Sequence, residues 1–152
     1  MNIRKAVTKD FPQILDLIKE LAEFENASHK VTNTVAQMIE EKDSFVVFVA
    51  ENKHNEIVGI ALCYEAYSTW VGKYLFLEDL IVNEKYRGKA MGSLLIHEVF
   101  KMAKESKYKR VRWQVLNWNS KAIEFYEKLG ASIDREWYNC DFDEEKINSL
   151  GY

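Results

Sequence analysis

Two neighbouring acids, Glu78 and Asp79, stand inside the otherwise apolar stretch 74–82 and are the first candidates for chemistry. Carboxylates in such a stretch are costly to bury unless something compensates their charge. Neighbours in a regular strand point to opposite faces of a sheet, unless a bulge changes the alternation. A structural ion pair or a strand end that reaches solvent would explain one acid. Two acids favour a functional site in which a cation is held.

The second candidate is the loop 83–93, which joins this stretch to an amphipathic helix. A loop that enters a helix exposes free backbone N–H groups at the positive end of the helix dipole, and these favour anions. Gly88 and Gly92 let a ligand come close because they lack a Cβ, while Arg87 and Lys89 add positive charge. The pattern predicts a phosphate site; the alternative is a glycine turn with two solvated cations. It matches neither the Gly-x-Gly-x-x-Gly fingerprint nor the Gly-Lys-Ser/Thr phosphate loop.

The remaining reactive side chains predict no further site. His29, His54 and His97 are scattered without the spacing of metal ligands, so we expect no metal. Cys63 and Cys140 are too few for a disulfide framework. No Ser-His-acid or Cys-His arrangement is indicated.

The elements that must position these candidates follow a pattern typical of an α+β domain. Strands are predicted at residues 2–7, 44–52, 57–68, 73–82 and 110–116, with a last strand pair within 131–142. Helices are predicted from Asp10 to about residue 21 and at about 32–42, 91–107 and 119–129. The strand 73–82 is expected to be buried on both faces. This order predicts a mixed, mostly antiparallel sheet of about seven strands with about four helices.

Length and composition agree with a single soluble domain over residues 1–152. Hydrophobic residues make up 47% of the chain and charged residues 30%. The net charge of −3 argues against a nucleic-acid partner bound by phosphate neutralisation. No apolar run reaches membrane length and the N-terminus lacks the apolar stretch of a signal peptide, so we expect a cytoplasmic protein without a membrane partner.

The loop sequence YRGKAMGSLL resembles the acyl-CoA pyrophosphate loop of the GNAT superfamily of N-acetyltransferases. The pattern of that loop is Arg/Gln-x-x-Gly-x-Gly/Ala, in which Arg87 takes the first position and Gly92 the last. Ala90 stands where the family has its middle glycine. Alanine keeps the N–H free and would be harmful only if the position requires a positive φ. We expect it to be tolerated, with some loss of CoA affinity.

Five further stretches resemble the diamine acetyltransferase branch, which contains the spermidine/spermine and the thialysine Nε-acetyltransferases. They lie between residue 3 and about residue 143 and read LIKELAEFE, YSTWVGK, YLFLEDLIV, VLNWN and AIEFYEKLGA. The resemblance implies the GNAT fold, acetyl-CoA as co-substrate, a small-molecule primary amine as acceptor and a homodimer. Polyamine-type members carry an aspartate and a proline where this chain has Ser68 and Thr69, which favours a thialysine-like acceptor.

The resemblance also assigns roles to residues. The cofactor-binding set is Leu80, Ile81, Val82, Arg87, Gly88, Lys89, Ala90, Met91, Gly92, Ser93, Asn119, Ser120, Lys121, Ala122 and Tyr126. The substrate-binding set is Phe24, Glu25, Trp70, Glu78 and Asp79. Tyr126 is expected to be the acid that assists the leaving thiolate. An alkylamine has a pKa near 10, so it must lose a proton, and we expect Glu78 to receive it through water.

Several of these residues could instead have a purely structural role. Packing alone would account for Tyr126 and Trp70, helix capping would account for Asn119, and Glu25 alone would be an ordinary exposed acid. Two other functions also stay open, namely a non-catalytic CoA-binding sensor or interaction domain and a peptide or protein N-acetyltransferase.

Overall fold

A computed structural model describes residues 1–151, which group into two compact units divided between Gln114 and Val115. The first unit contains the sheet and the helices α1 (Phe11–Phe24), α2 (Val35–Glu40) and α3 (Met91–Glu105). The second unit contains the helices α4 (Ser120–Lys128) and α5 (Glu144–Ser149).

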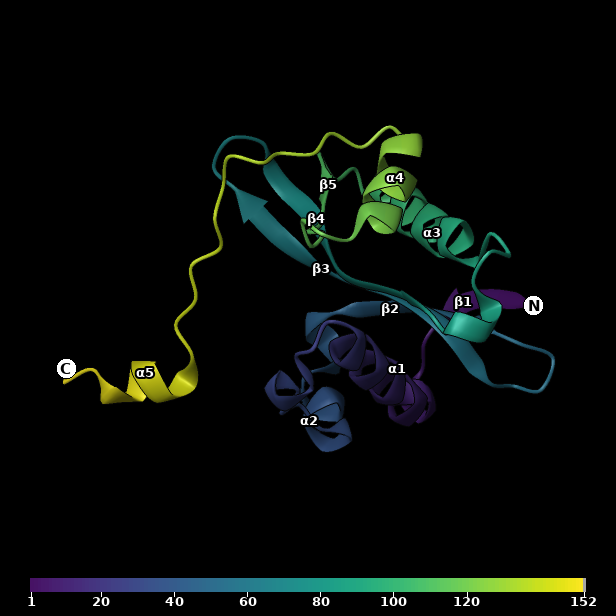
Figure 1. Cartoon of the computed structure of the whole chain (residues 1–152), viewed down its shortest axis with the longest axis horizontal. Coiled ribbons are helices and arrows are strands. Elements are labelled where there is room, and N and C mark those ends of the chain that lie inside the picture. The colour runs from purple at the N-terminus through teal and green to yellow at the C-terminus, as the bar shows by residue number, and fades with distance from the viewer. Residues whose placement is uncertain (152) are drawn as a thin grey trace. The chain divides into compact units, whose positions relative to one another are not determined.

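The sheet has the strand order β1-β2-β3-β4-β5 (Figure 1). Its strands are β1 (Asn2–Lys5), β2 (Val46–Glu51), β3 (Ile57–Ser68), β4 (Gly72–Val82) and β5 (Val111–Arg112). The strands β1 to β4 pair with one another in antiparallel fashion, whereas β5 runs parallel to β4. The predicted α+β class and mixed, mostly antiparallel sheet are confirmed.

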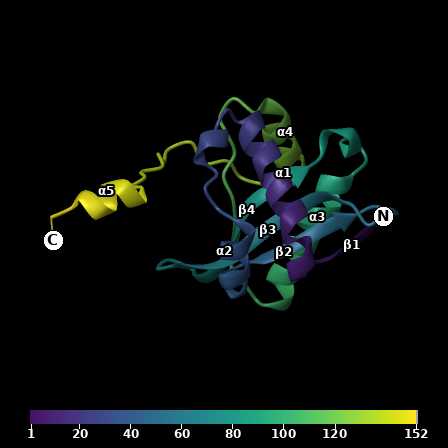
Figure 2. The same ribbon diagram turned by 90° about the horizontal axis from the view of Figure 1, so that it is seen from below.

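Helices cover both faces of this sheet (Figure 1). One face packs against α1 and α2, whose buried side chains meet those of the strands in one core cluster. Figure 2 shows α1 lying across this face. The opposite face packs against α3 and approaches it closely, because a Cβ at Gly59 would lie 3.1 Å from Leu95 Cδ1. The acids of β4 and the loop before α3 therefore sit on elements that are fixed from both sides.

The first helix forms as its apolar spacing predicts. Pro12 occupies its first turn, where a missing N–H costs nothing, and Ile14 and Leu17 are buried one turn apart. The helix ends at Phe24, with Glu25 as its C-cap residue. Phe24 and Glu25 are thereby placed at the end of a rigid, packed element.

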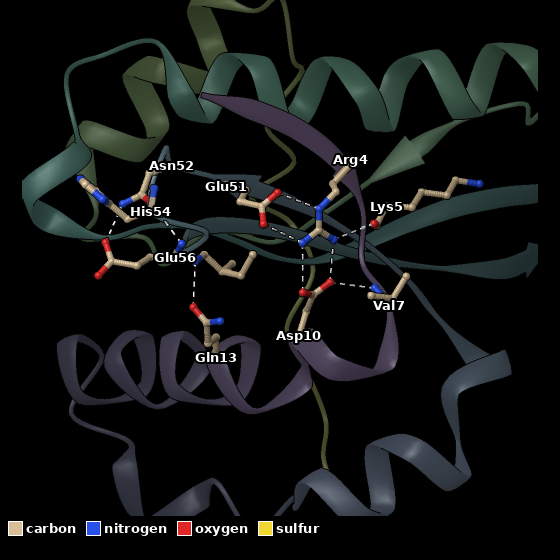
Figure 3. Close-up of polar contacts among 10 residues, drawn as sticks. Arg4, Lys5, Val7, Asp10, Gln13, Glu51, Asn52, His54 and Glu56 are labelled. Atoms are coloured by element: carbon tan, nitrogen blue, oxygen red, sulfur yellow. Dashed lines mark hydrogen bonds and ion pairs between the residues drawn. The ribbon is translucent and has the colours of Figure 1, made fainter.

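An ion-pair network joins the first strand, the first helix and the second strand (Figure 3). The Arg4 guanidinium donates to both carboxylate oxygens of Asp10, at 2.7 and 3.0 Å, and to Glu51 at 3.0 and 3.2 Å. The Val7 N–H also donates to Asp10, at 2.8 Å. Asp10 is only 3% exposed, so the charge of this carboxylate is compensated almost entirely by Arg4 and the backbone.

The strand count is lower than predicted, because residues 1–151 contain five paired strands rather than about seven. The predicted strand 110–116 pairs only over Val111 and Arg112. The predicted strand pair within 131–142 is wrong, since no residue of that stretch joins a sheet. There the Asp134 side chain accepts from the Glu136 N–H at 2.9 Å, a local turn that competes with strand pairing.

The prediction that the fourth strand is buried on both faces is also wrong. Leu75 and Leu77 are buried at 0% and 1% exposure, but Tyr74 and Phe76 on the other face are only half-buried. An apolar run in the sequence indicates hydrophobic side chains, but it does not indicate whether a helix covers both faces of the strand. The incompletely covered face is the one that carries the acids.

Candidate active site

A β-bulge in β4 brings both acids to one face of the sheet. Leu77 pairs with Cys63 and Asp79 pairs with Leu62, so Glu78 is the extra residue. The register places Asp79 on the face of Leu62, and the alternation from Phe76 places Glu78 on that same face. A regular strand would have separated the two carboxylates. The bulge therefore joins them in one site.

Glu25 completes an acid cluster with Glu78 and Asp79. Asp79 is half-buried, and its burial, followed by the charges of Glu78 and Glu25, raises its pKa to about 6. Although Glu25 is exposed as a residue, partial desolvation of its carboxyl raises its pKa as well. Three carboxylates that repel one another favour either a proton or a bound cation. The charges of Glu25 and Glu78 thus act on Asp79, and their common role in binding the substrate stays a prediction.

Tyr64 is a member of this site that sequence reasoning missed. Its ring stacks on Phe76 with 5.3 Å between centroids, and burial, the charge of Glu78 and a hydrogen bond with Glu78 raise its pKa to about 12. The signal was available in principle, because the hairpin register of β3 and β4 places Tyr64 opposite Phe76. The bulge that brings Glu78 to the same face could not be read from the spacing.

The loop 83–93, which the sequence predicts to bind phosphate and which is called the phosphate loop below, leaves its backbone accessible at Gly88. Gly88 has φ = 75°, and a Cβ there would meet no atom within 4 Å, so the loop offers open space at this point. The first ladder bond of α3 runs from the Leu94 N–H to the Ala90 carbonyl at 3.0 Å. The helix ladder therefore does not use the N–H groups of Met91, Gly92 and Ser93, and the N-cap residue makes no side-chain cap.

The cations of this loop are held by neighbouring residues. Arg87 donates from Nε to the Val82 carbonyl at 2.9 Å, and its guanidinium lies 5.8 Å from the centroid of the Phe24 ring. Lys89 Nζ lies 5.4 Å from the centroid of the Tyr86 ring. The end of α1 and the phosphate loop therefore meet, and this contact places Phe24 beside Arg87.

Two asparagines anchor the entry of the phosphate loop to the rest of the first unit. Asn83 donates to Glu20 of α1 at 3.0 Å. Asn52, which is 8% exposed, donates to the Tyr86 hydroxyl at 3.1 Å and to Glu56 at 2.6 Å. Sequence reasoning did not single out Asn52, and no local motif would have done so. The loop is positioned from both the helix and the β2–β3 turn.

Ala90 adopts a left-handed conformation, with φ = 58° and ψ = 11°. This is the condition under which an alanine was expected to be harmful, because a Cβ is unfavourable there by about 1–2 kcal/mol. The backbone is therefore strained at the point where the loop enters α3, and the expected loss of CoA affinity stays a prediction.

Replacing Ala90 by glycine should raise the free energy of unfolding by roughly 0.5–1 kcal/mol, because relief of this strain exceeds the extra chain entropy of glycine. Urea denaturation measures this, and titration with acetyl-CoA measures any gain in affinity. Lys107→Gly is the matched control, since Lys107 also has a positive φ of 57° but lies outside the loop. An Ala90→Gly variant that is less stable than the wild type would contradict the interpretation that Ala90 is strained.

The edge of β4 beyond Phe76 is open on the side of β5. In the described part of the chain β5 pairs only with Leu75 and Phe76, whereas Leu80 and Val82 pair with β3 alone. Ile81 is 3% exposed and belongs to the core, so only its backbone is available to a ligand. This edge fits a ligand that adds to the sheet as a strand does.

Trp70 does not join the acid cluster within the chain. It lies at the tip of the β3–β4 hairpin, 88% exposed, just before β4 begins at Gly72. Six residues of strand separate Gly72 from Glu78, which corresponds to roughly 20 Å. The position of Trp70 therefore does not favour the predicted substrate contact.

The second unit carries Tyr126 and the start of α4. Tyr126 is 8% exposed, and burial raises its pKa to about 12, so its hydroxyl stays protonated at neutral pH. Asn119 caps α4, because its side-chain oxygen accepts from the Ala122 N–H at 3.2 Å. Ser120 and Lys121 in the first turn are exposed. Asn119 thus caps the helix as predicted. A cofactor contact of Asn119 would have to use its side-chain NH₂ or its backbone.

Metal clusters and membrane spans are absent from residues 1–151. No group of three or more His, Cys, Asp or Glu residues in this range is arranged to hold a metal ion. No helix in the same range has the length and apolarity needed to cross a membrane.

A mixed sheet whose fourth strand leads through a glycine loop into an uncapped helix agrees with the acyltransferase fold that the sequence predicts. The chain belongs to the Acetyltransferase (GNAT) family, whose model matches residues 11–131. That match crosses the boundary between the two units. The chain is therefore an N-acetyltransferase, and the predicted family is confirmed.

Individual proteins support the assignment. The chain is 35% identical to the thialysine N-epsilon-acetyltransferase of Mus musculus, over 98% of this chain and 96% of that one. It is 29% identical to the spermidine/spermine N(1)-acetyltransferase-like protein 1 of Homo sapiens, over 99% of this chain and 24% of that one. A crystal structure of a mutant BH1408 protein from Bacillus halodurans has the same fold, with a TM-score of 0.79 and 19% identity over 93% of this chain and 99% of that one.

Proposed function

We propose that this N-acetyltransferase transfers an acetyl group from acetyl-CoA directly to the terminal primary amine of a small amino acid of the thialysine type. The acid cluster Glu25, Glu78 and Asp79 is the observation that carries the proposal, because such a cluster binds an ammonium group and can take up its proton. The similarity to relatives named for thialysine and for polyamines supports a small-molecule amine as acceptor.

The phosphate loop fits the pyrophosphate of acetyl-CoA. Gly88 leaves open space, the N–H groups of Met91, Gly92 and Ser93 begin α3, and Arg87 and Lys89 supply charge. The open edge of β4 at Leu80 and Val82 would receive the pantetheine arm through backbone groups. The first turn of α4, residues 119–122, would contact the same ligand. When bound, acetyl-CoA supplies the activated acetyl group.

The acid cluster would bind and deprotonate the amine. Sequence reasoning gave the role of proton acceptor to Glu78. The pKa of Asp79, about 6, matches that task better, because a base works best when its pKa lies near the working pH. Glu78 and Glu25 would then hold the ammonium group, and Phe24 would border it beside Arg87.

Tyr126 would donate the proton that the departing thiolate needs. Replacing it by phenylalanine should lower kcat by about 10²-fold and leave the Kd of acetyl-CoA nearly unchanged, because only the hydroxyl is removed. Stopped-flow thiol release measures the rate. Tyr67→Phe is the matched control, since Tyr67 is 73% exposed on β3. A Tyr126→Phe enzyme with the parent rate would remove Tyr126 from the mechanism.

Calorimetric titration with acetyl-CoA, followed by a thiol-release assay over thialysine, lysine, ornithine, putrescine and spermidine, tests the function itself. We expect acetyl-CoA to bind and kcat/KM to be highest for thialysine or another amino acid of this length. A large preference for spermidine would overturn the proposed acceptor. Binding without release on any amine would favour a CoA sensor, and turnover of peptides alone would favour a peptide N-acetyltransferase.

The cellular setting and assembly form the last part of the proposal. Free thiols at Cys63 and Cys140 suit a reducing, cytoplasmic compartment. The stretch 131–142 exposes Trp137 at 72%, Tyr138 at 94% and Phe142 at 61%. Exposed aromatic side chains on a segment without strand partners suit a homodimer interface.

A further inference from the structure

Arg110 is a cation for which the proposed chemistry so far has no use. It directly precedes β5, and its guanidinium lies over the Tyr74 ring at 4.4 Å from the centroid. Arg110 forms no ion pair with any described acid, and its Nε is buried without a hydrogen-bond partner. A guanidinium carries five donors in a fixed plane, so an unpaired one is a receptor for a carboxylate.

The ring beneath Arg110 lies on the same sheet face as the acid cluster. Tyr74 and Phe76 are two residues apart on β4 and share one face, and Tyr64 stacks on Phe76 from β3. Glu78 interacts with Tyr64 and so belongs to that face too. Along this face the order is Arg110 over Tyr74, then the stacked rings of Phe76 and Tyr64, and then the acids.

This face is shielded but not closed. Tyr64, Tyr74, Phe76 and Arg110 are all half-buried. Arg112, which pairs with Phe76 in the parallel register and is exposed, adds a second cation on the same face. The competing pair on this hairpin, Lys73 with Glu65 at 2.7 Å, lies at residues of the opposite face and leaves Arg110 unneutralised.

We infer that Arg110, supported by the Tyr74 ring, binds the carboxylate of an amino-acid acceptor whose terminal amine lies in the acid cluster. This inference rests on the proposed function and makes Arg110 a specificity-determining residue. It selects amino acids that carry a distal amine over diamines of the same length, which have a second cation where the carboxylate would be.

The span of the site agrees with such an acceptor. Four residues of β4 separate Tyr74 from Glu78, which is about 13 Å at the usual rise of a strand. An extended lysine-type chain separates its carboxylate from its amine by roughly 8 Å. A hydrogen bond of about 2.8 Å at each end brings the total close to that interval. The apolar middle of the chain would lie on Phe76 and Tyr64.

Matched acceptor pairs that differ only by the carboxylate test this inference. Lysine is compared with cadaverine, ornithine with putrescine, and thialysine with its decarboxylated diamine. We expect Arg110→Gln to lower the ratio of kcat/KM within each pair, amino acid over diamine, by about tenfold to a hundredfold. Arg110→Lys should lie in between, because it keeps the charge but loses the planar fork.

Two further measurements separate the possible failures. Lys101→Gln removes a cation on α3, away from this face, and should leave the ratio unchanged. Calorimetric titration of the CoA-bound enzyme with lysine and with cadaverine reads the same preference without turnover. An unchanged ratio in Arg110→Gln, or an equal loss on both members of each pair, overturns the inference. A wild type that binds and acetylates no amine overturns the proposed function instead.

Discussion

Asp79→Asn is expected to be more stable than the wild type at pH 7.5 and to acetylate amines roughly 10²-fold more slowly. Burial of Asp79, followed by the negative charges of Glu78 and Glu25, disfavours its ionised form and raises its pKa from 3.8 to about 6. Each unit corresponds to about 1.4 kcal/mol, so a neutral amide at this half-buried position should raise the free energy of unfolding by about 1–3 kcal/mol. Urea denaturation and thiol release measure the two effects.

The pH dependence of this difference has a definite sign. A carboxyl whose pKa is raised in the folded state binds its proton more tightly there, so it stabilises the fold at low pH and loses that contribution as the pH rises through about 6. The advantage of Asp79→Asn should therefore be full above pH 7, decline below pH 6 and vanish below about pH 4.

The pH dependence of kcat/KM should also show the ionisation of Asp79. Asp79 must be ionised to take a proton, so kcat/KM of the wild type should rise with pH along a limb centred near pH 6, and that limb should be absent from Asp79→Asn. Asp16→Asn on the exposed side of α1 is the matched control for both measurements. An Asp79→Asn enzyme that is destabilised and fully active would refute the role of this carboxylate.

Asp10→Ala should destabilise the protein by about 2–4 kcal/mol at pH 7 without changing the amine preference. Asp10 is buried, receives two hydrogen bonds from Arg4 and one from the Val7 N–H, and has no solvent to replace them. Removing its carboxylate leaves Arg4 with Glu51 and the Lys5 carbonyl, and leaves the Val7 N–H without its acceptor. Urea denaturation measures the loss of stability. A thiol-release assay should show that the ratios of kcat/KM between amine acceptors are unchanged.

The control for Asp10→Ala is a substitution of Glu98, a carboxylate in a longer ion pair. Glu98→Gln breaks a contact at 3.8 Å on α3 between the half-buried Glu98 and the exposed Lys101, and should cost less than about 1 kcal/mol. The hydrogen bonds from Arg4 lower the pKa of Asp10 below 3.8, so its contribution is present above that pH and is lost as the pH falls through the lowered value. Equal losses in Asp10→Ala and Glu98→Gln would refute a special role for the network.

The sequence alone was sufficient for the class of fold and for the position of the glycine loop between the fourth strand and its helix. The helix α1 and the strands β1 to β4 follow from apolar periodicity and β-branched composition, which are local properties. The bare backbone at Gly88 and the charge of Arg87 and Lys89 could likewise be recognised, because a strand, a glycine loop and an amphipathic helix are consecutive in the chain. The two unusual acids were visible as an interruption in an apolar run.

Tertiary structure decided what those acids can do. The bulge at Glu78 is a property of the pairing between β3 and β4, and it places both carboxylates on one face. The raised pKa of Asp79 depends on burial and on Glu25, which comes from the end of α1, more than fifty residues away in the chain. The left-handed φ at Ala90 and the stacking of Arg110 on Tyr74 are also consequences of packing.

The failed predictions have the same physical origin. A strand exists only where another backbone pairs with it, so the aromatic content of 131–142 could not establish a strand pair. Likewise, the apolar side chains of β4 could not reveal that the face with Tyr74 and Phe76 stays half-buried. Local sequence determines which elements form and which residues are reactive. Pairing register and burial, which are collective, determine which of those residues meet and how they ionise.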